Sequence, residues 1–199
     1  LLEPVQIKQV IDEFEKLGFI HNDETEITLE VNPATLTKEK CLGFKSAGVN
    51  RVSIGCQSFN DPFLKACNRE HSADQTRETI ALCQQYFENY SLDLLYSLPN
   101  QGLDHVVDDV EEMLSFNPPH ISAYCLTLPK NHPMNKGRCE EDEQVKMFEV
   151  ILEKLKNQGL FRYELSNFAK SGLESIHNNL YWTDKSYWGI GLSAHSYKA

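Results

Sequence analysis

The sequence has no long apolar run, little positive charge and no closely spaced cysteines. No apolar stretch approaches the roughly 20 residues of a membrane-spanning helix, although peripheral contact with a membrane stays open. Lysine and arginine number 19 against 29 aspartate and glutamate residues, which gives a formal net charge of −10. A nucleic-acid surface needs clustered basic side chains, so this balance argues against a nucleic-acid partner.

The six cysteines are scattered, and no two of them are separated by only two or three residues. Zinc and iron–sulfur sites usually bring their cysteines much closer in sequence, so neither spacing is present. Scattered unpaired cysteines suit a reducing compartment, which predicts a cytoplasmic protein. The chain begins "LLEPVQ" without methionine. We expect a fragment or a processed product, in which an upstream targeting signal would not be visible.

Apolar residues make up 41% of the 199 positions, enough for the core of one substantial domain. Segments with a strand pattern alternate with segments that carry a helical apolar stripe. Strands are expected at 26–33, 50–57, 90–99 and 120–128, and helices at 3–18, 36–48, 73–87, 103–116 and 140–158. Thr37 is an expected N-cap, and Ser72 with Gln75 an expected capping box. This repetition predicts an α/β fold of parallel βα units.

Every expected strand is apolar on one face and polar on the other. In the strand at 50–57, apolar positions 52, 54 and 56 alternate with polar or small positions 53, 55 and 57. Parallel strands covered by helices on both faces are instead apolar throughout, and a full eight-stranded barrel is filled with aliphatic side chains. The polar faces therefore predict an open, partial TIM-type barrel with room for ligands. An irregular sheet with one solvated face is the alternative.

The barrel domain is expected to span residues 1–128, and a C-terminal extension residues 129–199. The extension begins with a loop rich in Pro, Asn, Lys and Gly, continues through a helix into "LFRYELSNFA", and ends in a loop-like tail.

Polar residues at or near the carboxyl ends of three strands form a candidate site: Glu30, Gln57 and Asp93. Ligand sites of βα barrels form at that end. Two carboxylates and an amide facing one space suit ribose hydroxyls or an amino group, although each residue singly is more often a structural hydrogen-bonder. Arg69, in "NREH", has a side chain that suits a ligand carboxylate, with a surface salt bridge as the alternative.

The stretch "HNNLYW" places His177, two amides, Tyr181 and Trp182 within six residues of the tail. A histidine in a loop beside aromatic residues is more often a hydrogen-bonded packing element than a ligand. The alternative is a site for a flat, metal-bearing molecule, because neutral imidazole is a common metal ligand.

Eight motifs occur in order along the chain: "EVNP", "NRVSIGCQSFND", "NREH", "LDLLYSLPNQ", "PPHISAYCLTL", "YELSNFAK", "HNNLYW" and "GIGLSAHSY". Together they resemble the HemW-type haem chaperones. These are close relatives of the oxygen-independent coproporphyrinogen III oxidases within the radical S-adenosylmethionine (radical SAM) superfamily. The resemblance covers essentially the whole chain.

The resemblance implies a partial radical SAM barrel that holds S-adenosylmethionine at its open end. The implied cofactor-binding residues are Glu30, Gln57, Arg69 and Asp93, with Thr127 as a weaker candidate. The HNxxYW pattern marks the chaperone branch. His177 is then the candidate haem iron ligand, with Tyr181 and Trp182 as candidate haem-packing residues. His195, in "AHSY", is a second candidate and ranks lower, because neighbouring glycines indicate a tight turn.

The chain departs from the family pattern mainly by an absence. The three-cysteine motif C-x3-C-x2-C for the [4Fe–4S] cluster, and a "GGGTPS" segment, belong to the first two barrel strands and do not occur here. We therefore expect a barrel without those strands, with the cluster ligands upstream, and without radical chemistry of its own. Smaller departures are Asn68, Ser97 and Ser193, where the family usually has glycine, and Cys56, where it usually has valine.

Two functions of the parent protein follow from the resemblance. The first is a haem chaperone that binds haem and S-adenosylmethionine and delivers haem to haem-accepting proteins. The alternative is an oxidase that decarboxylates two propionates of coproporphyrinogen III to vinyl groups. A cluster-free remnant that acts as an interaction partner is a third and weaker reading.

Overall fold

The computed structural model describes residues 2–19 and 21–199. The helices are α1 (Pro4–Lys16), α2 (Lys38–Ser46), α3 (Asp61–Ala66), α4 (Ala73–Gln84), α5 (Leu103–Ser115), α6 (Glu141–Asn157) and α7 (Ile176–Trp182), with a short 3₁₀ turn at Pro133–Asn135. The strands are β1 (Thr28–Val31), β2 (Arg51–Gln57), β3 (Asn89–Tyr96), β4 (His120–Cys125), β5 (Phe161–Arg162) and β6 (Asn167–Ala169).

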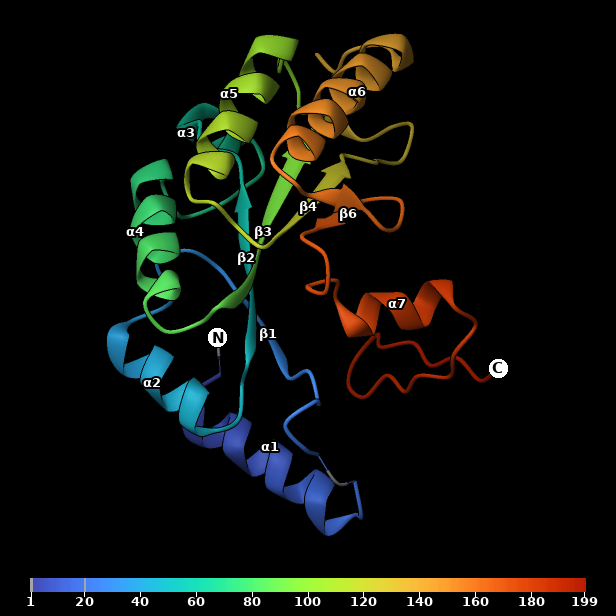
Figure 1. The fold of residues 1–199 in the computed structure, drawn as a ribbon. Coiled ribbons are helices and arrows are strands. Elements are labelled where there is room, and N and C mark those ends of the chain that lie inside the picture. Colours follow the sequence, from blue (N-terminus) through green and yellow to red (C-terminus); the bar gives the residue numbers. More distant parts are fainter. Residues whose placement is uncertain (1, 20) are drawn as a thin grey trace.

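The strands form one sheet in the order β1-β2-β3-β4-β6-β5 (Figure 1). Strands β1 to β4 pair in parallel, which confirms the predicted βα units. The sequence predicts that "LFRYELSNFA" belongs to an extension outside the barrel. The segment instead forms two short strands that join the same sheet. β6 pairs antiparallel with β4, and β5 antiparallel with β6. Within the described part of the chain, β1 and β5 are the edges of the sheet.

Helices cover the apolar face of the sheet, and the polar face looks the other way. Val52 and Ile54 of β2 and Leu92 and Leu94 of β3 are fully buried in one core cluster. Helix α6 adds Met147, Ile151 and Leu155 to the same cluster. Each such side chain contributes about 1.5–3 kcal/mol of transfer free energy. The predicted alternation of apolar and polar residues along each strand therefore separates the core from the polar face of the sheet.

The predicted helix starts are observed as side-chain caps. Thr37 Oγ1 accepts from the backbone N–H of Lys40 at 3.2 Å. Ser72 Oγ accepts from the Gln75 N–H at 3.2 Å, and Gln75 Oε1 accepts from the Ser72 N–H at 2.9 Å, which completes the capping box.

Ser72→Ala should lower the free energy of unfolding by about 1 kcal/mol, because one N–H of the first turn of α4 loses its acceptor. Urea denaturation measures the change, and Ser171→Ala in an exposed turn is the control. An effect no larger than that of the control would mean that solvent satisfies this helix end.

The three expected departures from glycine, at Asn68, Ser97 and Ser193, all adopt left-handed backbone. The φ angles are 54° at Asn68, 62° at Ser97 and 62° at Ser193. Residues with a Cβ rarely adopt this region, although asparagine tolerates it better than most. At Ser97 the buried hydroxyl gains a contact that glycine would lack, since it accepts from Arg138 Nη2 at 3.1 Å.

The prediction of a loop-like tail is wrong for "HNNLYW", because this stretch lies on α7. Ser175 caps this helix and accepts from the N–H of Asn178 at 3.3 Å. Two asparagines in seven residues have low helix propensity, so the local sequence concealed the helix. The serine three residues before Asn178 was the available signal.

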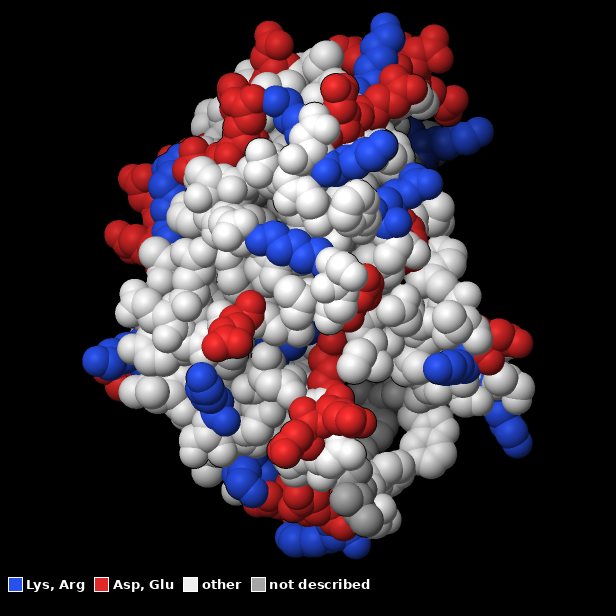
Figure 2. Space-filling view, in the orientation of Figure 1, with Lys and Arg blue, Asp and Glu red and all other residues white. Residues whose placement is uncertain are grey.

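The surface carries mixed charge. On the face in Figure 2, basic side chains are scattered among acidic ones over the upper part of the molecule. None of the helices in the described ranges is both long and apolar enough to cross a membrane.

Candidate functional site

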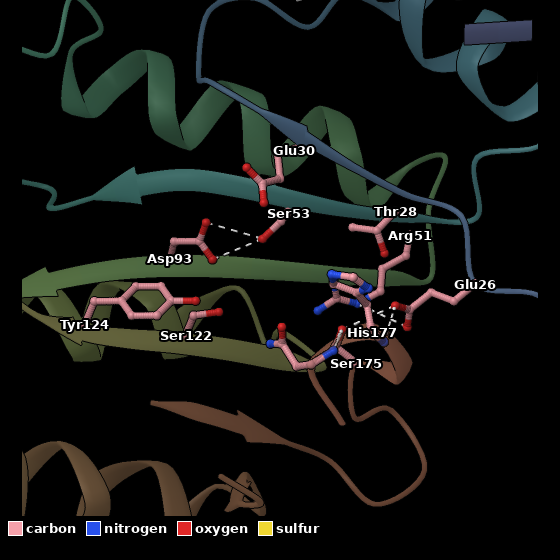
Figure 3. Close-up of a pocket in the computed structure, with 11 residues that line it drawn as sticks. Glu26, Thr28, Glu30, Arg51, Ser53, Asp93, Ser122, Tyr124, Ser175 and His177 are labelled. Atoms are coloured by element: carbon pink, nitrogen blue, oxygen red, sulfur yellow. Dashed lines mark hydrogen bonds and ion pairs between the residues drawn. The ribbon is translucent and has the colours of Figure 1, made fainter. Parts of the chain in front are cut away.

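A cavity of about 500 Å³ lies on the polar face of the sheet, between the strands and the start of α7. The residues that line it are Glu26, Thr28, Glu30, Arg51, Ser53, Asp93, Ser122, Tyr124, Ser175, His177 and Asn178. Figure 3 shows an acidic group of Glu30 and Asp93 beside Ser53, and a second group of Glu26, Arg51 and His177 where the strands begin. The cavity therefore has an acidic region and a region that contains one arginine.

Asp93 is the central group of the acidic region. Ser53 Oγ donates to its two carboxylate oxygens at 3.1 and 3.3 Å. Burial raises the pKa of Asp93 to about 6, and the negative charge of Glu30 adds to the rise. The hydroxyls of Ser53 and Ser122 and the positive charge of Arg51 oppose it. A carboxylate held in this way is a strong acceptor for a ligand hydroxyl or ammonium group.

The three strand-end candidates are only partly brought together. Glu30 and Asp93 share the cavity, but Asp93 lies in the middle of β3 and not near its end. Gln57 ends β2 with φ 67° after a register irregularity, and it does not line the cavity. Its Nε2 lies 3.1 Å from where a Cβ on Gly55 would be. Gln57 thus lies farther toward the carboxyl ends of the strands than Asp93.

Arg69 lies near Gln57 at the carboxyl ends of the strands, and Asn32 connects them. Arg69 Nη1 donates to Asn32 Oδ1 at 3.2 Å. Asn32 Oδ1 also lies 3.5 Å from the Gly55 Cβ position, close to Gln57. Thr127 is exposed, follows β4, and donates to the carbonyl of Cys125 at 3.3 Å. It makes no contact with the cavity lining that would assign it to the site.

Glu26 fixes α7 to the beginning of the sheet, across 150 residues of sequence. Its carboxylate accepts from the N–H of Ile176 at 3.1 Å and of His177 at 3.4 Å, and from Ser175 Oγ at 3.3 Å. A carboxylate at a helix N-terminus satisfies free N–H groups and complements the helix dipole. Glu26 therefore determines where His177 lies.

His177 lies at the edge of the cavity with its ring engaged by a neighbour. Its Nε2 is 2.7 Å from Tyr181 Oη, one turn along α7, and Tyr181 packs edge-on against Tyr187 at 4.5 Å between ring centroids. Trp182 is half-exposed and, by helix geometry, lies about 140° around the helix from His177. The helix thus brings Tyr181 to His177 and leaves Trp182 on another side.

The second histidine candidate lies elsewhere. His195 is exposed in the C-terminal segment, and its backbone approaches Gly189 so closely that a Cβ there would collide with it. This agrees with the predicted tight turn.

A hydrogen-bonded chain that the sequence did not reveal runs beside the cavity. Ser91 Oγ lies 2.7 Å from His120 Nδ1, and His120 Nε2 lies 2.8 Å from Tyr163 Oη. Tyr163 Oη in turn accepts from the N–H of Ser175 at 3.3 Å. Burial lowers the pKa of His120 to about 3, so the ring is neutral. The polar alternation of β4 indicated that His120 faces inward, but only the fold supplies its partners.

Within residues 2–19 and 21–199, no group of three or more His, Cys, Asp or Glu side chains has the arrangement of a metal site. All six cysteines are free thiols. The residues of this chain do not by themselves fit an iron–sulfur cluster.

Comparison with known proteins supports membership of the radical SAM superfamily. The radical SAM superfamily model matches residues 3–113. The chain is 36% identical to "Heme chaperone HemW" of Bacillus subtilis, over 98% of the chain and 54% of that protein. It is 35% identical to "Heme chaperone HemW" of Escherichia coli, over 86% of the chain and 47% of that protein. The chain thus spans about half the length of the curated relatives it matches.

Solved structures show the same fold. The coproporphyrinogen III oxidase HemN of Escherichia coli, described as a radical SAM enzyme, superposes with a TM-score of 0.80 at 20% identity. The match covers 98% of this chain and 49% of that one. The predicted α/β fold, a partial radical SAM barrel, is thereby confirmed. From the family match over more than half of its residues, the chain belongs to the radical SAM superfamily.

Proposed function

We propose that this chain is the haem- and S-adenosylmethionine-binding part of a haem chaperone, which delivers haem to haem-accepting proteins. The observation that carries the proposal is the 36% identity to the Bacillus subtilis haem chaperone along almost the whole chain. The free thiols suit a reducing compartment, and we propose a cytoplasmic location.

The polar face fits the cofactor of the superfamily. Glu30 and Asp93 offer carboxylate oxygens to ribose hydroxyls or to the ammonium group, and Arg69 offers a guanidinium to the methionine carboxylate. When bound with a reduced cluster, S-adenosylmethionine supplies radical chemistry to this superfamily. The [4Fe–4S] ligands are proposed to lie in a preceding segment, since C-x3-C-x2-C does not occur here.

The haem proposal places the iron at His177. The side chain is exposed, and among the described residues its Nε2 is hydrogen-bonded to a tyrosine hydroxyl, which an iron ion can replace as the partner. Tyr181 lies on the same side of α7 and is proposed to pack against the porphyrin, together with Trp182 if the helix end rearranges.

The second candidate is a coproporphyrinogen III oxidase, as the structurally similar HemN is described. The same cavity would then receive a reduced porphyrin. At 20% identity this similarity supports the fold rather than the reaction.

Haem titration of His177→Ala tests the chaperone proposal. We expect the wild-type chain to shift the Soret band of haem, and the variant to lose the shift, because it lacks the imidazole that would hold the iron. His195→Ala is the matched control and should bind as the wild type does.

An equal Soret shift in the two alanine variants would exclude His177 as the ligand. Conversion of coproporphyrinogen III to protoporphyrinogen by the cluster-reconstituted full-length protein would favour the oxidase.

A further inference from the structure

We propose that Arg51 forms a buried subsite for a ligand carboxylate at the end of the cavity where the strands begin. Arg51 is the first residue of β2 and points into the cavity on the same face as Ser53 (Figure 3). It lies within the motif "NRVSIGCQSFND" but is not among the candidate site residues of the sequence analysis.

The guanidinium of Arg51 is buried without a matching partner. The residue is 4% exposed, and its Nε has no hydrogen-bond partner among the described residues. Glu26 Oε2 lies 3.9 Å from that nitrogen, too far for a hydrogen bond. A buried charge is costly unless it is paired and hydrogen-bonded. The structure thus holds the Nε–H of a charged side chain without an acceptor among the described residues.

Glu26 is not free to become that acceptor. Both of its carboxylate oxygens receive hydrogen bonds from the start of α7, at 3.1 to 3.4 Å. Turning the carboxylate toward Arg51 would leave the N–H groups of Ile176 and His177 unsatisfied. The intramolecular pair therefore balances charge but does not use the directed donors of the guanidinium.

The charges around Arg51 select the kind of anion. Glu26, Glu30 and Asp93 line the same cavity, so a doubly charged phosphate would meet three carboxyl groups. A single carboxylate meets less repulsion, and its two oxygens match the planar fork of a guanidinium. Asn178 and His177 line the same cavity and supply further polar groups.

The cavity therefore has a positive charge at the end where the strands begin and negative charges farther along them. Arg51 pairs in register with Asn89, and Asp93 lies four residues farther along β3, a backbone separation of roughly 13 Å. A fitting ligand has a carboxylate at the Arg51 end. The subsite itself follows from the geometry, whereas its identification as the site of a porphyrin propionate rests on the proposed haem function.

Comparing haem with its dimethyl ester tests the proposal, because the ester keeps the iron and the ring and removes both negative charges. We expect the wild-type chain to bind haem about 10- to 100-fold more tightly than the ester, the range expected when charge-assisted hydrogen bonds are lost. Arg51→Gln should lose this preference and bind both alike. Arg77→Gln, an arginine on α4 outside the cavity, is the control and should keep the preference.

Equal affinity of the wild type for haem and the ester would overturn the propionate subsite and leave haem binding by His177 standing. An equal loss of both ligands in Arg51→Gln would assign Arg51 a structural role and overturn the proposal as well. Circular dichroism checks folding. If Arg51→Gln fails to fold, the double variant Arg51→Gln/Glu26→Gln also removes the carboxylate that Arg51 faces. The affinities of the wild type for haem and for the ester test the proposal in either case.

If the wild type binds neither porphyrin, the haem proposal fails and sodium propionate becomes the probe of the subsite. A thermal midpoint that rises with propionate in the wild type but not in Arg51→Gln would support the subsite. Midpoints that move equally, or not at all, would overturn it.

Discussion

Asp93→Asn should make the protein more stable at pH 8, by about 1–3 kcal/mol, even though it removes a candidate ligand of the site. The carboxylate is half-buried beside Glu30, and its partial burial raises its pKa to about 6. Asparagine has nearly the same shape and cannot ionise. Ser53 Oγ can still donate to its amide oxygen from the present position.

The sign of the effect follows from proton linkage. The pKa of Asp93 is about 6 in the fold and close to its ordinary value in the unfolded chain. The folded state therefore holds the proton of Asp93 more tightly, so the contribution of this group to stability is greatest below about pH 4 and falls as the pH rises through 6. Above pH 6 the half-buried negative charge opposes folding, and only the asparagine variant avoids it.

Urea denaturation of the wild type and Asp93→Asn at pH 4 and pH 8 measures the difference. We expect a gain at pH 8 that shrinks toward zero at pH 4, and no such pH dependence for the exposed control Asp23→Asn. A destabilisation at pH 8 would mean that the carboxylate organises the polar face. The expected gain would show that the charge of Asp93 is kept at the expense of stability, as is common for groups of a functional site.

Phe168→Ala should lower the free energy of unfolding by about 3–5 kcal/mol, the usual loss for a buried aromatic ring. Phe168 lies on β6, is 1% exposed and pairs in register with Ile121 of β4. Its ring centroid is 6.4 Å from that of Phe148 on α6. Alanine would leave a cavity between the C-terminal segment and the parallel strands.

Phe161→Ala on the neighbouring strand β5 is the matched control. Phe161 is 56% exposed, so its loss should change stability by no more than about 0.5 kcal/mol. Guanidinium denaturation followed by far-ultraviolet circular dichroism measures both variants.

The same experiment tests how residues 129–199 relate to residues 1–128, a division that stays a prediction. Because β6 completes the sheet beside β4, we expect one cooperative transition that moves as a whole in Phe168→Ala. Two separated transitions would show that the C-terminal segment unfolds by itself.

The sequence by itself determined the βα organisation, the helix caps at Thr37 and Ser72, and the polar inner face that carries Glu30 and Asp93. These features depend on residues within one helical turn or on alternation along one strand, so local order is enough to predict them. The motifs also indicated the superfamily, because their order along the chain is specific even where each motif is short.

Only the tertiary structure decided which residues form the end of the cavity where the strands begin. Glu26 and His177 are 151 residues apart, yet the carboxylate of one accepts from the backbone of the other. Helix α7 combines poor helix formers with a cap from another part of the chain, and no local pattern reports such a partner. Arg51 belongs to the alternation of β2, but only the folded structure reveals that its Nε has no hydrogen-bond partner among the described residues. Burial and long-range contacts set these properties, and both depend on the packed chain rather than on neighbours in sequence.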